Sequence, residues 1–262
     1  MPRKPKRCPV VMIHGAFCGP WAFDEFRLPF EDAGFSVHAP ALRHHEHGQN
    51  PPPALGHTSL LDYAEDLAQF AAKLPEQPVL VGHSLGGLLA QMLAARGLAR
   101  ALVLLAPSAP WGVLPSTIFE LASSQTLFFA HGDYRGSVIR PSYHIAAAHS
   151  LDRLDDSERS AAFARFVPES GQATFEVMHW SFDARRASRV AARGVACPVL
   201  CLAGSDDRIN PPSTVRRIAQ RYDGLATFEE LSGMSHWLIG EPGWSDIARR
   251  AVKWVEGATR AP

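Results

Sequence analysis

Six short apolar runs, separated by segments of helical pattern, constrain the fold more than any other feature of the sequence. Several of these runs are almost continuously apolar, as is expected of strands that are covered on both faces. They span residues 8–15, 35–42, 78–84, 101–107, 198–204 and 226–231. Because strands alternate with helices along the chain, we predict an α/β fold with a mostly parallel sheet of about six strands flanked by helices.

Helical patterns occupy the segments between and after these runs. The predicted helices cover approximately residues 20–33, 58–74, 85–97, 211–222 and 241–257. In the second of them, one apolar face is expected to contain Leu61, Ala64, Ala68 and either Ala71 or Ala72, which recur at helical spacing.

Residues 111–190 break the alternation, because they show helical and loop patterns but no convincing strand. The segment is rich in aromatic residues, which include Phe119, Phe128 and Phe129. We predict that it forms a helical cap, or lid, over one edge of the sheet. The core would then consist of residues 1–110 and 191–262, and some cap aromatics would line an apolar ligand pocket.

The overall composition narrows the range of partners. The chain has 262 residues, of which 46% are hydrophobic, and its 26 basic residues balance 26 acidic ones. This balance gives no indication of nucleic-acid binding or of attraction to an anionic membrane. The basic start "MPRKPKR" is not followed by a signal-peptide core, and no apolar run is long enough for a membrane helix.

The cysteine spacing fits neither a zinc site nor a disulfide framework. The four cysteines are Cys8, Cys18, Cys197 and Cys201. Free thiols are the default in a reducing compartment, so we expect a cytoplasmic protein without disulfides.

The sequence "GHSLGG" (82–87) lies where the apolar run at 78–84 meets a predicted helix. It matches G-x-S-x-G, in which a tight strand-to-helix turn presents a nucleophilic serine and requires small residues on both sides of it. Gly82 and Gly86 meet that requirement. The helix that follows directs its N-terminus toward the negative charge that develops during reaction. We therefore predict that Ser84 is a nucleophile.

A serine hydroxyl is a weak nucleophile until a base removes its proton, and the base needs an acid to orient it. In a chain with this motif the order is Ser…Asp/Glu…His, with each residue in a loop after a strand. His236, in "LSGMSHWLIGEPGW", follows the last predicted strand. We predict that His236 is the base.

Two backbone N–H groups are needed to bind the oxyanion of an acyl-transfer reaction. One is expected from Leu85, the residue after the serine. The other is expected from "HGAFCGPW" (14–21), where Gly15 allows close approach, Ala16 is the first choice as donor and Phe17 the second. The residues expected to line the substrate pocket are Phe17, His83, Trp111 and Trp237.

Four segments, "HGAFCGPWAF", "GHSLGG", "AGSDDRINPP" and "GMSHW", together resemble the α/β-hydrolase superfamily over nearly the whole chain. The chain is most similar to the compact branch that includes bacterial carboxylesterases and the plant methylesterase and hydroxynitrile-lyase group. The lyases of this branch usually have Thr at the position of Gly15 and Lys at that of Trp237, so the resemblance implies hydrolysis. Ser84 departs from the aspartate nucleophile of dehalogenases and most epoxide hydrolases.

The resemblance also implies which of two adjacent aspartates completes a Ser-His-Asp triad. The family pattern Gly-x-x-Asp-x-x-x-Pro, counted from Gly204, selects Asp207 and places Pro211 four residues later. Asp206 does not fit this count. Neighbouring residues of an extended loop point in different directions, so only one can reach His236. Asp206 is then expected to be a hydrogen-bond acceptor within the loop.

We expect a serine hydrolase that cleaves a small to medium, largely apolar carboxylic ester through an acyl-enzyme, with no metal or organic cofactor. A thioesterase, lactonase or C–C bond hydrolase would use the same triad, and a ligand receptor with a hydrolase fold is a further alternative. The loop "LRHHEHG" (42–48) contains His44, His45 and His47. We interpret it as solvent-exposed rather than as a metal site.

Overall fold

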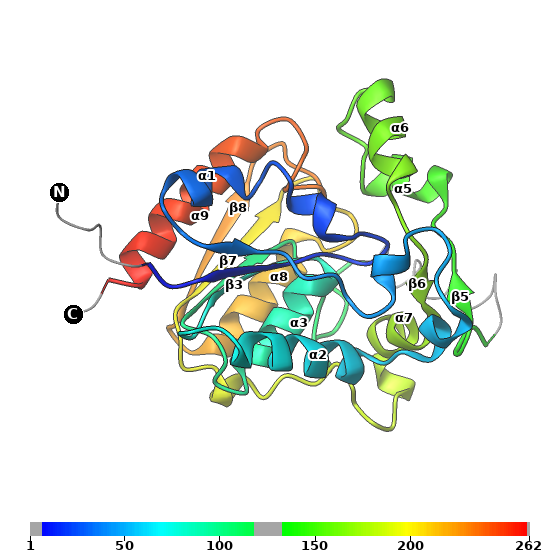
Figure 1. Ribbon diagram of the computed structural model, residues 1–262, viewed down its shortest axis with the longest axis horizontal. Helices are drawn as coiled ribbons and strands as arrows, with labels where there is room; N and C mark the ends of the chain where they lie inside the picture. Colours follow the sequence, from blue (N-terminus) through cyan, green and yellow to red (C-terminus); the bar gives the residue numbers. More distant parts are fainter. Residues whose placement is uncertain (1–6, 118–132, 261–262) are drawn as a thin grey trace.

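A six-stranded parallel sheet forms the centre of the computed structural model, which describes residues 7–117 and 133–260. Its strands lie in the order β2-β1-β3-β4-β7-β8, and every neighbouring pair is parallel (Figure 1). The strands are β1 (Val10–Ile13), β2 (Val37–His38), β3 (Val79–His83), β4 (Ala101–Leu105), β7 (Val199–Gly204) and β8 (Ala226–Leu231). Each of the six apolar runs contains one strand, which confirms the predicted fold class.

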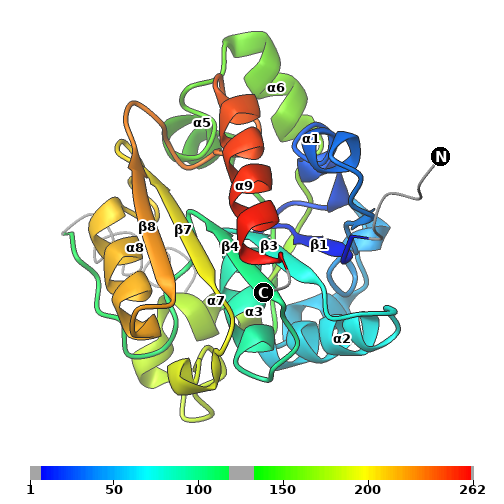
Figure 2. The same cartoon turned by 90° about the vertical axis from the view of Figure 1, so that its left-hand side faces the viewer.

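Helices cover both faces of the sheet (Figure 2). One face carries α1 (Leu28–Asp32) and α9 (Trp244–Ala258), and the other carries α2 (Leu60–Ala72), α3 (Leu85–Ala94) and α8 (Pro212–Ala219). Short 3-10 helices connect the larger elements: η1 (Pro20–Phe23), η2 (His45–His47), η3 (Pro53–His57), η5 (Ala192–Gly194) and η6 (Gln220–Tyr222). The single helix predicted at 20–33 is therefore divided into η1 and α1.

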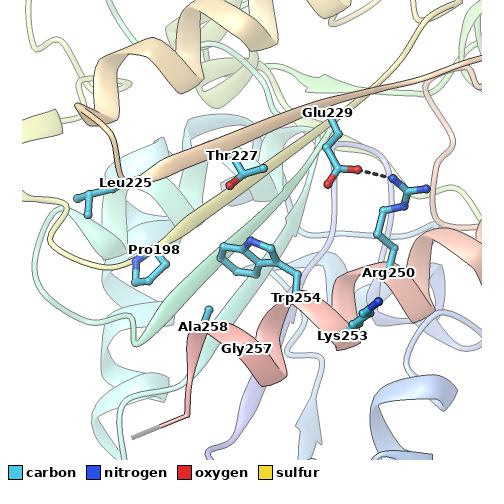
Figure 3. Close-up of a pocket in the computed structure, with 9 residues that line it drawn as sticks. All are labelled: Pro198, Leu225, Thr227, Glu229, Arg250, Lys253, Trp254, Gly257 and Ala258. Atoms are coloured by element: carbon cyan, nitrogen blue, oxygen red, sulfur yellow. Dashed lines mark hydrogen bonds and ion pairs between the residues drawn. The ribbon is translucent and has the colours of Figure 1, made fainter. Parts of the chain in front are cut away.

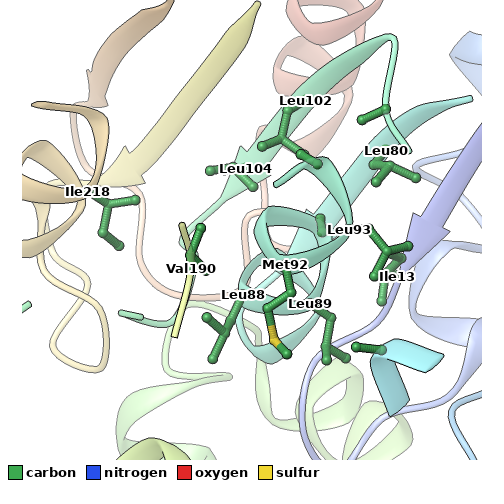
Figure 4. Close-up of a cluster of buried hydrophobic side chains, with 14 of the residues drawn as sticks. Ile13, Leu80, Leu88, Leu89, Met92, Leu93, Leu102, Leu104, Val190 and Ile218 are labelled. Atoms are coloured by element: carbon green, nitrogen blue, oxygen red, sulfur yellow. The ribbon is translucent and has the colours of Figure 1, made fainter. Parts of the chain in front are cut away.

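The sheet separates two apolar cores because successive side chains of a strand point to opposite faces. In β1, Val11 and Ile13 pack with α2 and α3, whereas Val10 and Met12 pack with α9. Figure 4 shows the first of these clusters, in which Ile13 and Leu80 from the sheet face the side chains of α3. Burial on both faces explains why the strands are apolar almost throughout.

Helix α2 buries a stripe that overlaps the predicted one in part. Its buried residues are Leu60, Tyr63, Ala64, Leu67 and Ala71. The prediction is confirmed for Ala64 and Ala71 and wrong for Leu61 and Ala68, which are only half-buried. The observed buried face also includes the Tyr63 side chain.

The segment 111–190 contains β5 (Val138–Ile139), α5 (Tyr143–His149), α6 (Asp156–Ala164), β6 (Glu169–Ser170), α7 (Gly171–Met178) and η4 (Trp180–Phe182). These elements lie on the side of the sheet at which β1 ends (Figure 1). The antiparallel pair of β5 and β6 was not predicted, because strands of two residues leave no periodic pattern. Phe119, Phe128 and Phe129 lie outside the described residues.

Cys8, Cys18, Cys197 and Cys201 are buried free thiols, which agrees with the sequence-based expectation of no disulfide. Within residues 7–117 and 133–260, no helix combines the length and the apolar character that crossing a membrane would require.

Candidate active site

Ser84 lies on the sharp turn between β3 and α3, with backbone angles φ 52° and ψ −119°. The turn leaves no room for a side chain two residues before or two residues after Ser84. A Cβ atom at Gly82 would lie 2.3 Å from the Gly86 carbonyl oxygen, and one at Gly86 would lie 2.0 Å from the Ile13 carbonyl oxygen. Positive φ is strained for a residue other than glycine and persists only where the surroundings enforce it. The predicted elbow geometry is therefore present.

The structure brings together the serine, histidine and aspartate that were predicted from the sequence. His236 Nε2 lies 3.0 Å from Ser84 Oγ, and His236 Nδ1 lies 2.9 Å from Asp207 Oδ2. The side chains of His236 and Asp207 are buried. They follow β8 and β7 respectively, whereas Ser84 follows β3. The carboxyl ends of three parallel strands thus place the three side chains at one edge of the sheet.

The two adjacent aspartates have different surroundings. Asp207 is buried, and its Oδ1 accepts hydrogen bonds from the backbone N–H groups of Ile209 at 2.8 Å and Asn210 at 2.9 Å. Asp206 is exposed, and its carboxylate contacts Ser205 and Arg153. Only Asp207 therefore has an oxygen fixed by the backbone and a second oxygen directed at His236.

His83 supports the backbone of His236. Its ring is buried, and Nε2 donates to the His236 carbonyl oxygen at 2.9 Å. Burial and, to a lesser degree, the neighbouring His236 lower the pKa of His83 from 6.5 to about 3. His83 is therefore neutral near pH 7, with its proton on Nε2. It acts as a fixed hydrogen-bond donor there.

The loop after β1 lies directly against the serine. A Cβ atom at Gly15 would be 3.1 Å from Ser84 Cβ, which is tighter than an ordinary contact, so glycine favours this close approach. Leu85 is the first residue of α3, and the first N–H groups of a helix have no partner within it. The N–H of Phe17 points instead to a carboxylate oxygen of Glu169 at 3.4 Å. Because the Phe17 N–H already has a partner, Ala16 remains the first choice as the predicted donor of this loop.

The four predicted pocket residues divide into two groups. Phe17 lies in the loop after β1, and His83 directly precedes Ser84. The buried Trp237 ring packs edge-on against His83, with 5.5 Å between ring centroids. Trp111 packs instead against Trp180, with 5.4 Å between ring centroids, and under the guanidinium of Arg186.

A buried polar cluster beside the loop after β1 was not predicted. Glu169 of β6 is 1% exposed and bonds to His45 Nε2 at 3.2 Å and to the Tyr63 hydroxyl at 2.7 Å. The interpretation of the 42–48 loop as solvent-exposed is therefore wrong for His45, which is 4% exposed. His45 and Glu169 are 124 positions apart in the sequence, and no local pattern could have revealed the pair.

The other polar residues of that loop lie nearer the surface. The ligand atoms of His44, Glu46 and His47 lie within 4.8 Å of one another, and two of the three residues are exposed. They are the residues that could hold a metal ion in the described part of the chain. Exposed carboxylate and imidazole groups often gather without an ion, and we assign none here.

An open groove between β8 and α9 lies away from the serine (Figure 3). Pro198 and Leu225, which line it, precede β7 and β8, so the groove is at the amino ends of these strands. Ser84 follows the carboxyl end of β3. The groove is therefore not part of the predicted active site.

Comparison with known proteins agrees with this geometry. Residues 10–245 match the model of the alpha/beta hydrolase family. A pyrethroid hydrolase of Sphingobium wenxiniae is 36% identical over 81 residues, which cover 30% of this chain and only 27% of that relative. The fold is similar to that of a monoacylglycerol lipase of Paleococcus ferrophilus, with a TM-score of 0.71, 23% identity and coverage of 98% and 96% of the two chains. It is also similar to a methylesterase from Arabidopsis, with a TM-score of 0.72, 13% identity and coverage of 96% and 100%. The chain therefore belongs to the alpha/beta hydrolase family.

Proposed function

We propose that the protein is a serine hydrolase of carboxylic esters, with Ser84 as nucleophile, His236 as general base and acid, and Asp207 as the acid that orients the histidine. The observation that carries the proposal is the position of the His236 ring, whose two nitrogens lie 3.0 Å from Ser84 Oγ and 2.9 Å from Asp207 Oδ2. This arrangement supplies the base and its orienting group, which a serine needs for nucleophilic attack.

In the acylation step, Ser84 Oγ attacks the ester carbonyl carbon while His236 Nε2 takes the hydroxyl proton. The carbonyl oxygen becomes an oxyanion, which accepts hydrogen bonds from the N–H groups of Ala16 and Leu85. Asp207 stabilises the imidazolium that forms. When the intermediate collapses, the bond to the alkoxy oxygen breaks, and Nε2 returns the proton to that oxygen as the alcohol leaves.

In the deacylation step, water takes the place of the departed alcohol. His236 Nε2 removes a proton from the water, whose oxygen attacks the acyl carbon. The second tetrahedral intermediate releases the carboxylic acid and restores the Ser84 hydroxyl with the proton from Nε2. Every step uses groups of this chain and water, so we propose no metal or organic cofactor.

We propose further that residues 111–190 form a cap over the site and that the substrate is small to medium in size and largely apolar. Aromatic side chains beside His236, one of them from the 111–190 segment, support both the cap and the apolar character of the substrate. The ring centroids of Trp21 and Trp237 are 6.0 Å apart, and Phe166 from the 111–190 segment lies 6.0 Å from Trp237. The similar proteins named above, a hydrolase, a lipase and a methylesterase, are consistent with ester cleavage.

The test is a panel of p-nitrophenyl esters of increasing acyl length, assayed with the wild type and with Ser84→Ala. We expect hydrolysis of short and medium acyl esters by the wild type, and a loss of about 10⁶-fold in kcat for Ser84→Ala. A fluorophosphonate probe should label the wild type and not the variant. Equal turnover by the two proteins would overturn the proposal.

A parallel panel of thioesters, lactones and β-diketones separates ester hydrolysis from thioesterase, lactonase and C–C bond hydrolase activity. Preferred turnover of one of these classes would keep the triad and change the substrate. Stable binding of a small molecule without any turnover would indicate a ligand receptor instead.

A further inference from the structure

The Glu169 carboxylate lies at a junction of four chain segments. Oε1 accepts hydrogen bonds from the Tyr63 hydroxyl and from the Ser170 N–H, both at 2.7 Å. Oε2 accepts from His45 Nε2 at 3.2 Å and from the Phe17 N–H at 3.4 Å. A buried carboxylate is stable only when such donors replace water. Glu169 therefore links β6 to α2, to the 42–48 loop and to the loop that carries Ala16.

The same stretch of chain holds both backbone groups of Phe17. The Phe17 N–H donates to Glu169, and the Phe17 carbonyl oxygen accepts from the Val167 N–H at 2.8 Å. Phe17 has φ 62°, a conformation that the surrounding contacts must maintain. Its N–H belongs to the peptide unit that begins at Ala16. Fixing that unit limits the directions that the neighbouring Ala16 N–H can take.

The charge of Glu169 is balanced inside the cluster. Burial raises the pKa of Glu169, but His45 and the hydrogen-bond donors outweigh this, and the pKa is lowered overall. Burial likewise lowers the pKa of His45, whereas the Glu169 carboxylate more than offsets it, and the pKa is raised overall. Each group thus favours the charged form of the other, and the two lie 3.2 Å apart beside the loop where an oxyanion would form.

The His45 ring also connects the cluster to the start of the loop after β1, which carries Gly15 and Ala16. It packs edge-on against His14, with 5.2 Å between ring centroids. His14 Nε2 accepts from the Leu42 N–H at 3.1 Å, and Nδ1 contacts the Gly15 carbonyl oxygen at 2.9 Å. The residues on both sides of Gly15 and Ala16 are therefore tied to the same buried network.

We propose that Glu169 is a positioning residue that fixes the oxyanion-binding loop through the Phe17 peptide. The 111–190 segment thereby sets the direction of the Ala16 N–H. This inference rests on the proposed ester hydrolysis. Its consequence is specific: loss of the Glu169 contact weakens binding of the tetrahedral state more than binding of the ester.

Glu169→Gln tests the role because an amide cannot replace this carboxylate. The amide has one oxygen, whereas donors converge on both oxygens of Glu169. The amide oxygen is expected to face Tyr63 and Ser170, where the present bonds are shortest. The amide NH₂ group then faces the Phe17 N–H, and because both groups are donors the bond to Phe17 is lost. Glu169→Asp is a second test, because it keeps the charge but draws the carboxylate back by one methylene.

Glu176→Gln is the matched control. Glu176 of α7 is fully buried and accepts hydrogen bonds from the Ser59 hydroxyl at 2.8 Å and the Leu60 N–H at 2.8 Å. It joins the 111–190 segment to the start of α2 in the same manner, but its bonds to Ser59 and Leu60 do not involve the loop after β1. A purely structural role of such carboxylates would give similar results for the two Gln variants.

The experiment measures kcat and KM with p-nitrophenyl butyrate and the inhibition constant of butylboronic acid, which forms a tetrahedral adduct with an active serine. For Glu169→Gln and Glu169→Asp we expect kcat to fall about 10- to 100-fold, with a similar weakening of boronic acid inhibition and a KM within about twofold of wild type. For Glu176→Gln we expect kcat and inhibition within about twofold of wild type.

Three outcomes would contradict the expectation in distinguishable ways. An unchanged kcat for folded Glu169→Gln and Glu169→Asp, in an active wild-type background, would overturn the positioning role and leave the ester hydrolase proposal intact. Equal losses in Glu169→Gln and Glu176→Gln would reduce Glu169 to a structural anchor. A wild type that turns over no ester and is not labelled by the fluorophosphonate would overturn the proposed function and this inference with it.

Discussion

Replacing Asp207 with Asn should disable His236 by reversing the position of its proton. Oδ1 of Asp207 is held by the N–H groups of Ile209 and Asn210, at 2.8 and 2.9 Å. In Asp207→Asn the amide oxygen keeps these two donors, so the amide NH₂ group takes the place of Oδ2. That position is 2.9 Å from His236 Nδ1. A donor at this place forces Nδ1 to be the acceptor and leaves the proton on Nε2, where the ring cannot accept a proton from Ser84.

The expected magnitude follows from the loss of the reactive tautomer. A triad with a correctly placed but wrongly protonated histidine loses about 10³- to 10⁴-fold in kcat. This corresponds to about 4–5.4 kcal/mol of transition-state stabilisation. KM should change little, because Asp207 lies behind the imidazole and does not face the substrate.

Asp206→Asn is the matched control for this prediction. Asp206 is exposed, and its contact with Arg153 at 3.4 Å joins two side chains that are both about half exposed. Exposed ion pairs of this kind contribute about 0–1 kcal/mol to stability. We expect kcat of Asp206→Asn within about twofold of wild type.

The assay is steady-state hydrolysis of a p-nitrophenyl ester from pH 6 to 9, with circular dichroism to verify folding. A loss of activity in Asp206→Asn together with retention in Asp207→Asn would refute the assignment of the acid. Retention in both variants would refute the tautomer argument as a whole.

Two further predictions concern stability. Gly86→Ala places a Cβ atom 2.0 Å from the Ile13 carbonyl oxygen and should lower the free energy of unfolding by about 3 kcal/mol, measured by urea denaturation. Gly257→Ala is its control, since a Cβ atom there has no neighbour within 4 Å, and it should raise that free energy by about 0.5–1 kcal/mol. Burial lowers the pKa values of His14 and His83 from 6.5 to about 3. At a pH between these two values the unfolded chain therefore binds more protons than the folded chain. The contribution of the two neutral rings to the free energy of unfolding is complete above pH 6.5. It is lost as the pH falls toward 3, at about 1.4 kcal/mol per pH unit for each ring. Unchanged stability at pH 4 would contradict the neutral state of both rings.

Local sequence patterns predicted the features that depend on local rules. The six strands could be found because parallel strands are buried on both faces, which leaves a continuous apolar run. The turn at Ser84 could be found because Gly82 and Gly86 meet a steric requirement within five residues. Asp207 was distinguished from Asp206 by a family pattern, and the buried contact with His236 agrees with that choice.

Features that depend on contacts distant in sequence were missed. Glu169 looks like an ordinary acidic residue of a loop, and His45 looks like part of a solvated histidine cluster. Their burial depends on each other, because either charge alone would be costly to remove from water. Tyr63 was left out of the predicted face of α2, since its hydroxyl has no apparent reason to be buried until Glu169 is placed beside it.

The contacts of the 111–190 segment differ between its two halves. In β6 and α7, buried carboxylates of Glu169 and Glu176 make directional hydrogen bonds to the core. The α5 and α6 half packs on the core mainly through aromatic rings, with 6.0 Å between the ring centroids of Phe166 and Trp237. Its ion pairs to the core, Arg153 with Asp206 and Arg165 with Asp24, join exposed side chains. Hydrogen bonds specify geometry strictly, whereas apolar packing accepts side chains of similar volume. Substitutions in α5 and α6 are therefore expected to alter which ester fits, and substitutions around β6 to alter how fast any ester reacts.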